Sequence, residues 1–260
     1  MSFWFYFFIF ILGINLGSFI NAFNYRLYVG ENILKGRSHC PKCQHILTWR
    51  DLIPLFSFLS LKGKCRYCHQ SISWHYPAVE LSAGLLLLII WIFSANYVLA
   101  SFYSLIFLIL LTLAAFDLKY YLIPDSLLLG CLAINILFWI WQTYKFSGNW
   151  LGVSMKSGVM AGALGFVFLG LIYILTRGRG MGFGDVKMIF VIGLIIGWPN
   201  IIPAVFLSFF IGAIIGLALV GIGRKNIKEA LPFGPFLFLG GLISALWGAQ
   251  IINWYLSLFF

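Results

Sequence analysis

The chain has 260 residues, of which 62% are hydrophobic and 9% are charged, and its formal net charge at pH 7 is +10. A soluble domain carries about a quarter charged residues, so this composition excludes an ordinary soluble globular protein and indicates a polytopic membrane protein. The surplus of basic residues could suggest nucleic-acid binding, but the bias of Lys and Arg toward one side of a membrane explains it. We therefore expect the lipid bilayer as a partner and no nucleic acid.

Eight segments are apolar enough to be candidates for membrane-spanning helices, which need about 20 residues. They cover residues 3–27, 78–95, 98–116, 122–142, 158–176, 186–198, 201–222 and 233–258. The sixth is short and ends at a Trp-Pro pair, so it could also join the seventh in a re-entrant pair. The sequence predicts an all-α membrane protein of about eight transmembrane helices. Its parts are a first helix (1–29), a cysteine-containing loop (30–77) and a helical core (78–260).

The basic residues predict the orientation of these helices. Eight spans place fifteen of the seventeen on one side, namely Arg26, Lys35, Arg37, Lys42, Arg50, Lys62, Lys64, Arg66, Lys119, Arg177, Arg179, Lys187, Arg224, Lys225 and Lys228. Lys145 and Lys156 fall on the other side. Because cytoplasmic loops are enriched in Lys and Arg, we expect the first side to be cytoplasmic and both termini to lie outside.

The loop contains two Cys-x-x-Cys pairs, Cys40–Cys43 and Cys65–Cys68, with 21 residues between them. Two such knuckles can present four thiolates tetrahedrally, as in a structural zinc ribbon. Two disulfides are the alternative, which the reducing cytosol disfavours. Four cysteines leave no open position for water, so we expect one structural zinc ion per chain. Three neighbouring histidines, His39, His45 and His69, could replace a cysteine as a metal ligand. The simpler interpretation is that they are surface residues.

Two aspartates lie at the ends of apolar segments in a chain with only seven acidic residues. Asp117 closes the run LIFLILLTLAAFD, where its charge opposes the helix dipole. Asp185 closes the turn Gly182-Phe183-Gly184-Asp185, whose glycines permit close approach of the backbone. The predicted topology places both at the cytoplasmic edge of the membrane. Ionisable groups at that depth mark function, and two close carboxyls sharing a proton can hydrolyse a peptide bond.

Simpler explanations exist for each acidic residue. Asp125 directly follows Pro124. Proline and acidic residues are both favoured in the first turn of a helix, so a structural role is enough to explain Asp125. Asp117 could be a solvated turn carboxylate paired with Lys119, and Asp185 could be a helix N-cap. The aspartates could also be ion sites of a transporter, or the catalytic pair of a Gly-x-Gly-Asp intramembrane protease with another substrate.

An ordered set of motifs resembles the type IV prepilin leader peptidases, a family of bacterial membrane aspartyl proteases. These motifs are Gly17-Ser18-Phe19-Ile20-Asn21, the two cysteine knuckles, Ile53-Pro54, Leu61-Lys62-Gly63-Lys64, Ile72-Ser73, Tyr76-Pro77, Val79-Glu80, the Asp117 segment with Pro124-Asp125, and Gly182–Asp185. The family commonly has arginine where this chain has His75. The resemblance covers most of the chain.

The resemblance implies a function that the residue pattern alone does not. Asp117 and Asp185 would be the catalytic pair, supported by Gly182, Gly184, Lys187, Pro124 and Asp125. The enzyme would remove the basic leader from prepilins and pseudopilins at the cytoplasmic face of the bacterial inner membrane. Members that keep the cysteine loop usually also methylate the new amino terminus with S-adenosylmethionine. For this second reaction we consider Glu80 and Asn21 as candidate residues, although Glu80 could equally serve to position the loop.

Overall fold

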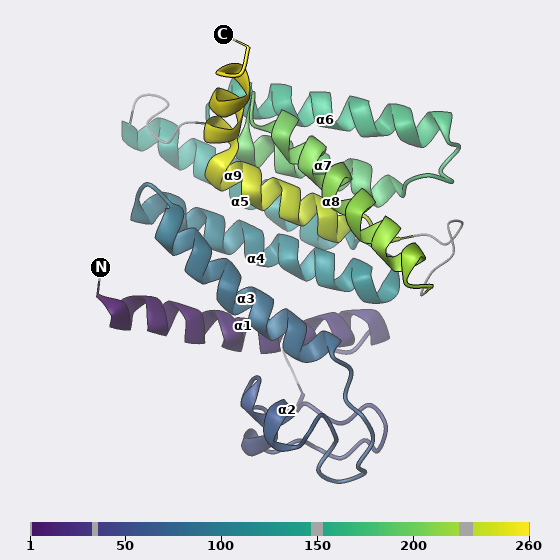
Figure 1. Ribbon diagram of the computed structural model, residues 1–260. Coiled ribbons are helices and arrows are strands. Elements are labelled where there is room, and N and C mark those ends of the chain that lie inside the picture. The colour runs from purple at the N-terminus through teal and green to yellow at the C-terminus, as the bar shows by residue number, and fades with distance from the viewer. Residues whose placement is uncertain (1, 33–35, 147–152, 224–230, 260) are drawn as a thin grey trace. The chain divides into compact units, whose positions relative to one another are not determined.

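The computed structural model describes residues 2–32, 36–146, 153–223 and 231–259. Within them the regular secondary structure is helical, as predicted, with one 3-10 turn and two isolated β-bridges in the cysteine-containing loop (Figure 1). The helices are α1 (Phe3–Val29), α2 (Phe56–Ser60), α3 (His75–Phe93), α4 (Tyr97–Tyr120), α5 (Asp125–Phe146), α6 (Met155–Leu175), α7 (Phe183–Ile196), α8 (Ile201–Gly221) and α9 (Gly234–Leu256). Lys35, Arg224, Lys225 and Lys228, used above for orientation, lie outside the described residues.

All eight predicted segments form helices, and seven of the helices in the described part of the chain are long and apolar enough to span a membrane. The exception is α7, which has 14 residues and is therefore about 21 Å long, less than the apolar thickness of a bilayer. It begins at Phe183, three residues earlier than predicted, so Asp185 lies inside its first turn. Most of its residues are buried, including the whole run Val191–Ile196. The sixth segment is thus a core helix.

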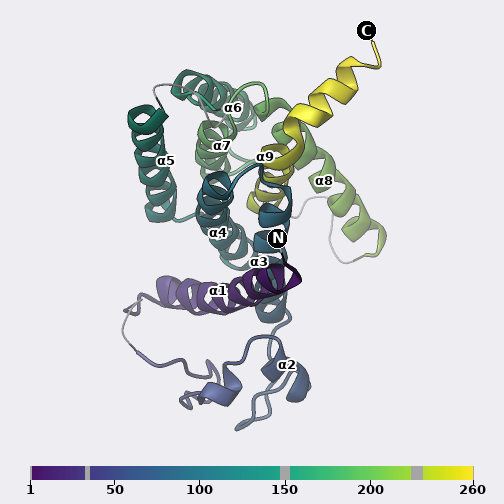
Figure 2. The same ribbon diagram turned by 90° about the vertical axis from the view of Figure 1, so that its left-hand side faces the viewer.

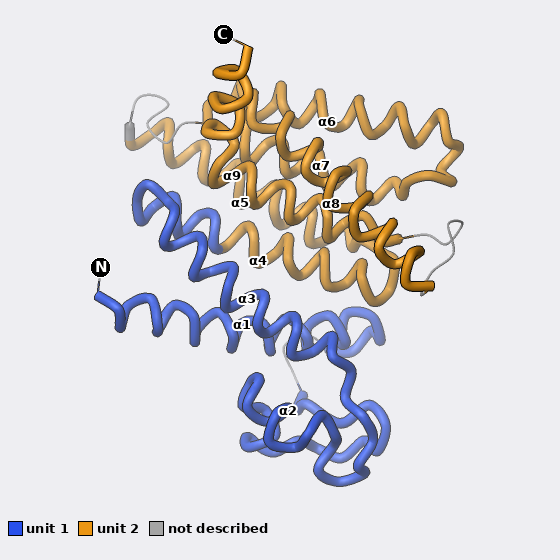
Figure 3. Tube along the Cα trace, in the orientation of Figure 1, with its two compact units in different colours: residues 1–104 blue, residues 105–260 orange. Residues whose placement is uncertain are grey.

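The chain divides into two compact units, residues 1–104 and 105–260 (Figure 3). In the first unit, α1 packs against α3 through small residues, and a methyl group on Gly17 would lie 2.6 Å from the Glu80 Cα atom. The cysteine loop joins these two helices along the chain. In the second unit, α7 packs against α5, α6 and α9 (Figure 2). The aspartates therefore belong to the second unit, and the cysteines, Glu80 and Asn21 to the first.

Glycines allow the helices of the second unit to approach closely. A methyl group added to Gly193 of α7 would lie 2.6 Å from the Gly162 Cα atom of α6. One added to Gly240 of α9 would lie 2.4 Å from the Ala204 carbonyl oxygen of α8. Small residues at such crossings are typical of membrane helices, which associate through van der Waals packing and interhelical hydrogen bonds.

We predict that Gly193→Ala lowers the thermal unfolding temperature of the detergent-solubilised protein. The added methyl group meets backbone atoms that cannot rotate away, and such overpacking costs about 1–3 kcal/mol. Gly130→Ala is the matched control, because nothing lies within 4 Å of a methyl group at that helical glycine. It should leave the transition unchanged or raise it slightly. Equal destabilisation by both substitutions would contradict the close α6–α7 contact.

Candidate active site

Asp117 lies in the last turn of α4 and is buried, with 6% of its surface exposed. Its Oδ2 atom accepts a hydrogen bond of 3.0 Å from the backbone N–H of Gly234, the first residue of α9. A methyl group on Gly234 would lie 2.8 Å from the same oxygen. The amino end of α9, where the helix dipole is positive, thus faces this carboxyl at close range.

Asp185 lies in the first turn of α7 and is equally buried, with 6% exposed. Its Oδ2 atom accepts a hydrogen bond of 3.2 Å from the Gly182 N–H. Its Oδ1 atom is buried and has no hydrogen-bond partner among the described residues. One oxygen is therefore fixed by the glycine turn, and the other is available to bind a water molecule or a substrate.

Both carboxyls are buried, and each belongs to the terminal turn of a helix. Two contacts join the segments that carry them. A methyl group on Gly184 would lie 3.0 Å from the Ile123 Cβ atom, so the glycine turn packs directly against the α4–α5 connection. The Lys187 ammonium group also forms an ion pair with Asp125 at the start of α5. These contacts hold the amino end of α7 against the turn that follows Asp117.

The residues predicted from the sequence to support the catalytic pair all make specific contacts near it. Pro124 directly precedes α5, and its carbonyl oxygen accepts a hydrogen bond of 3.3 Å from the Leu127 N–H. Gly182 can carry no larger side chain easily, because a methyl group there would lie 3.3 Å from the Asp185 Oδ2 atom. Gly184 and Asp125 make the contacts described above, and the Lys187 ammonium also lies 5.3 Å from the centre of the Phe183 ring.

Sequence reasoning missed Gly234 as part of the site. A signal was present, because Pro232-Phe233-Gly234-Pro235 places a proline in the first turn of α9, where proline is favoured. That signal predicts a helix start, however, and does not predict which side chain the helix end faces. The pairing of Gly234 with Asp117 joins residues 117 positions apart and needed the tertiary structure.

The four cysteines of the loop form one cluster. Their Sγ atoms all lie within 4.8 Å of one another, all four thiols are free, and Cys40 and Cys65 are buried. The Sγ atoms of Cys40 and Cys68 are 3.9 Å apart. Four thiolates at about 2.3 Å from one zinc ion would be about 3.8 Å apart, whereas a disulfide requires about 2.05 Å. The cluster therefore has the donors and spacing to hold a metal ion.

The two knuckles have the same backbone hydrogen bonds. The Cys40 N–H donates to the His45 carbonyl and the Gln44 N–H to the Cys40 carbonyl. In the second knuckle, the Cys65 N–H donates to the Gln70 carbonyl and the His69 N–H to the Cys65 carbonyl. Gln44 and His69 occupy equivalent positions with φ of 58° and 56°. Among the described residues, the group of side chains that could hold a metal ion contains no histidine.

Glu80 and Asn21 connect the helices of the first unit to the loop. The Glu80 Oε2 atom accepts a hydrogen bond of 2.8 Å from the Leu55 N–H of the loop. The Asn21 side-chain amide of α1 donates a hydrogen bond of 3.0 Å to the Tyr76 carbonyl in the first turn of α3. Both side chains are buried. These contacts support a positioning role, and a role in methyl transfer stays a prediction.

Fold and site together define a multi-pass membrane protein with a buried carboxyl pair and a four-thiol loop. The family model of the bacterial peptidase A24 N-terminal domain matches residues 11–94, and that of the type IV leader peptidase family matches residues 104–217. The chain belongs to the type IV leader peptidase family, which confirms the resemblance found in the sequence.

Three relatives illustrate the extent of this similarity, and each is called a prepilin leader peptidase/N-methyltransferase. The protein of Aeromonas salmonicida (strain A449) is 32% identical, over 98% of this chain and 95% of the relative. That of Bacillus subtilis (strain 168) is 35% identical, over 96% of this chain and 97% of the relative. That of Legionella pneumophila is 37% identical, over 87% and 77% respectively. No solved structure matches the chain.

A crosslinking experiment tests whether the two acidic segments meet. We predict that the double variant Ile123→Cys/Gly184→Cys forms an intramolecular disulfide on mild oxidation, because the two Cβ positions are adjacent. Ile140→Cys/Gly184→Cys is the control, since Ile140 lies on the exposed surface of α5, about 22 Å along the helix from its first residue, Asp125. Mass spectrometry of the linked peptides gives the result. Crosslinking of the control alone, or of neither pair, would contradict the site.

Proposed function

We propose that the chain is a prepilin leader peptidase and N-methyltransferase, the activity for which its relatives are named. The observation that carries this proposal is the direct contact between the two segments that carry the buried residues Asp117 and Asp185, in a member of the type IV leader peptidase family. The substrates would be prepilins and pseudopilins in the bacterial inner membrane. The excess of Lys and Arg supports a cytoplasmic active site.

We propose that Asp117 and Asp185 share one proton and act as a pair. The ionised carboxyl takes a proton from a water molecule, whose oxygen attacks the carbonyl carbon of the scissile bond, while the protonated carboxyl polarises the carbonyl oxygen. The tetrahedral intermediate then collapses, the C–N bond breaks, and a carboxyl delivers a proton to the leaving amine. The unpartnered Asp185 Oδ1 atom supports a water position at this carboxyl. Because the pair titrates as a unit, neither role is assigned to one aspartate.

The backbone around the pair would keep its geometry during this reaction. The Gly182 and Gly234 N–H groups each bind one carboxylate oxygen, so neither side chain needs to reorient before water is activated. The Asp125–Lys187 ion pair would act one step further away, by holding α7 against the start of α5. We infer a direct role for Asp117 and Asp185 and a positioning role for Asp125 and Lys187.

We predict that Asp117→Asn and Asp185→Asn each reduce leader removal from a prepilin by more than about a thousandfold, because each removes a proton-transfer group. Asp125→Asn removes the same charge from the neighbouring helix start and should cost about tenfold or less, since it only weakens positioning. Cleavage is measured by the mass of a prepilin incubated with the purified protein, and the thermal transition confirms that each variant is folded. Substantial cleavage by either of the first two variants would exclude that residue from the pair.

We further propose that the cysteine cluster holds one structural zinc ion. The four thiols fill a tetrahedral set, so the ion would have no position for substrate or water. Zinc, when bound, would fix the two knuckles to each other and thereby the whole loop. S-adenosylmethionine is the proposed methyl donor, and it would supply a methyl group to the amine that cleavage exposes. The contact of Glu80 with Leu55 would keep the zinc loop against α3 in this second reaction.

Metal analysis tests the zinc proposal. We expect about one zinc per purified chain, and none when Cys40, Cys43, Cys65 and Cys68 are all replaced by serine. Methylation of a co-expressed prepilin should fall more than leader removal in that variant, because the aspartates lie in the other compact unit. Cys131→Ser is the control, since this buried thiol of α5 lies outside the cluster. Freshly purified protein without zinc would refute the metal assignment, and equal loss of both reactions would indicate general destabilisation.

A further inference from the structure

A basic hollow lies beside the second cysteine knuckle. Its volume is about 290 Å³, and its lining includes Ser60, Lys62, Lys64, Cys65, Arg66 and His69. Among the described residues, no carboxylate lines it. Binding sites for whole small molecules usually occupy about 300–1,000 Å³, so the hollow fits a small group better than a large ligand. Three basic side chains around a small space favour an anion.

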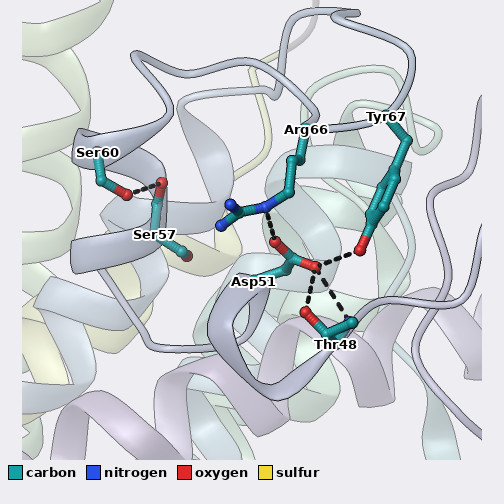
Figure 4. Close-up of polar contacts among 6 residues, drawn as sticks. All are labelled: Thr48, Asp51, Ser57, Ser60, Arg66 and Tyr67. Carbon is teal, nitrogen blue, oxygen red and sulfur yellow. Dashed lines mark hydrogen bonds and ion pairs between the residues drawn. The ribbon is translucent and has the colours of Figure 1, made fainter.

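Asp51 fixes one of these cations in place (Figure 4). Its Oδ1 atom accepts a hydrogen bond of 2.7 Å from the Arg66 Nε atom, and its Oδ2 atom accepts bonds from the Tyr67 hydroxyl (3.0 Å) and the Thr48 hydroxyl (2.8 Å). Burial opposes ionisation of this carboxyl, but the hydrogen bonds from Arg66 and Thr48 outweigh it and lower the pKa of Asp51 to about 2. The guanidinium group is therefore oriented by a charged partner at neutral pH.

Lys62 and Lys64 leave the hollow with a surplus of positive charge. Both are exposed, and neither forms an ion pair within the described part of the chain. Asp51 can neutralise only the charge of Arg66. A phosphate group in the hollow would meet two unneutralised ammonium groups and the free edge of a guanidinium group, which are the usual partners of phosphate.

Apolar side chains lie immediately before this basic segment. In α2, Phe58 is buried, whereas Phe56 is 63% and Leu59 is 69% exposed. The helix follows Leu55, which is hydrogen-bonded to Glu80 within the first two turns of the spanning helix α3. This tether keeps α2 near the end of a membrane span. Exposed apolar groups beside basic residues at that level are typical of a segment lying in the membrane interface.

We propose that the hollow binds the phosphate of an anionic phospholipid, with Phe56 and Leu59 lying among its acyl chains. Charge complementarity selects this occupant. S-adenosylmethionine carries a sulfonium cation and an ammonium group, which Lys62, Lys64 and Arg66 would repel. A basic prepilin leader would be repelled for the same reason. The site would anchor the cysteine loop to the membrane surface, and it is independent of the catalytic pair.

Binding of short-chain phosphatidylglycerol to the purified 260-residue protein in neutral detergent tests the site by native mass spectrometry. We expect phosphatidylglycerol to bind more tightly than phosphatidylcholine. Lys62→Gln/Lys64→Gln should weaken phosphatidylglycerol binding by about tenfold or more, because it removes both unneutralised charges. Arg37→Gln/Lys42→Gln removes two charges of the same loop that do not line the hollow and should change the affinity less than about twofold. Equal losses in the two variants would show diffuse attraction and overturn the site.

Two further measurements test whether the bound phosphate belongs to a lipid or to a free phosphate compound. Phe56→Ser/Leu59→Ser should weaken phosphatidylglycerol binding several-fold while leaving the binding of inorganic phosphate unchanged. No effect of this variant on phosphatidylglycerol would indicate a free phosphate compound and overturn the lipid assignment. Displacement of phosphatidylglycerol by S-adenosylmethionine would overturn it in favour of a methyl-donor site. Zinc content and thermal transitions confirm that each variant is folded. None of these readouts depends on cleavage or methylation, so the proposal can fail while the proposed function stands.

Discussion

The contact between the α4–α5 turn and the amino end of α7 is the constraint on which the candidate active site depends. Gly184 lies against Ile123 without a side chain to separate them, and the Asp125–Lys187 ion pair joins the same two segments two and three residues further along the chain. A carboxyl at the end of one membrane helix can reach a carboxyl at the start of another only if the two helix ends meet. Both carboxyls are buried, and a charge interaction is stronger in such surroundings because they are less polar than water.

Burial of α7 explains why this arrangement is compatible with a membrane. A helix of 14 residues cannot present an apolar surface to the whole bilayer thickness. Neighbouring helices surround it, and close glycine contacts with α6 let it sit in the protein interior. Its first turn can then carry an acidic residue and a glycine-rich approach, since irregular backbone at membrane depth is tolerated where protein surrounds it. Local backbone chemistry and tertiary packing thus support the same site.

Much of the fold could be predicted from the sequence, because long apolar runs allow few alternatives to helices. The cysteine cluster was also predictable, since two knuckles of fixed spacing bring their thiols together locally. The burial of α7 was not, because hydrophobicity does not distinguish a core helix from a membrane span. The Gly234–Asp117 and Glu80–Leu55 hydrogen bonds were missed, since backbone N–H groups carry no residue-specific signal and the partners are distant in sequence. The sequence therefore indicated which side chains carry the chemistry, but it did not indicate which backbone N–H groups bind them.

The separation of the two aspartates with a substrate present is the most direct test of the central claim. An experimental structure with a bound, uncleavable prepilin peptide would give the distances from the Asp117 and Asp185 carboxylate oxygens to the scissile carbonyl group and to the nearest ordered water. A shared water requires both carboxyls within hydrogen-bond distance, about 2.6–3.2 Å, of the same molecule. The account predicts this water beside the scissile bond. Carboxyls too far apart to contact one water, or a peptide bound away from them, would contradict it.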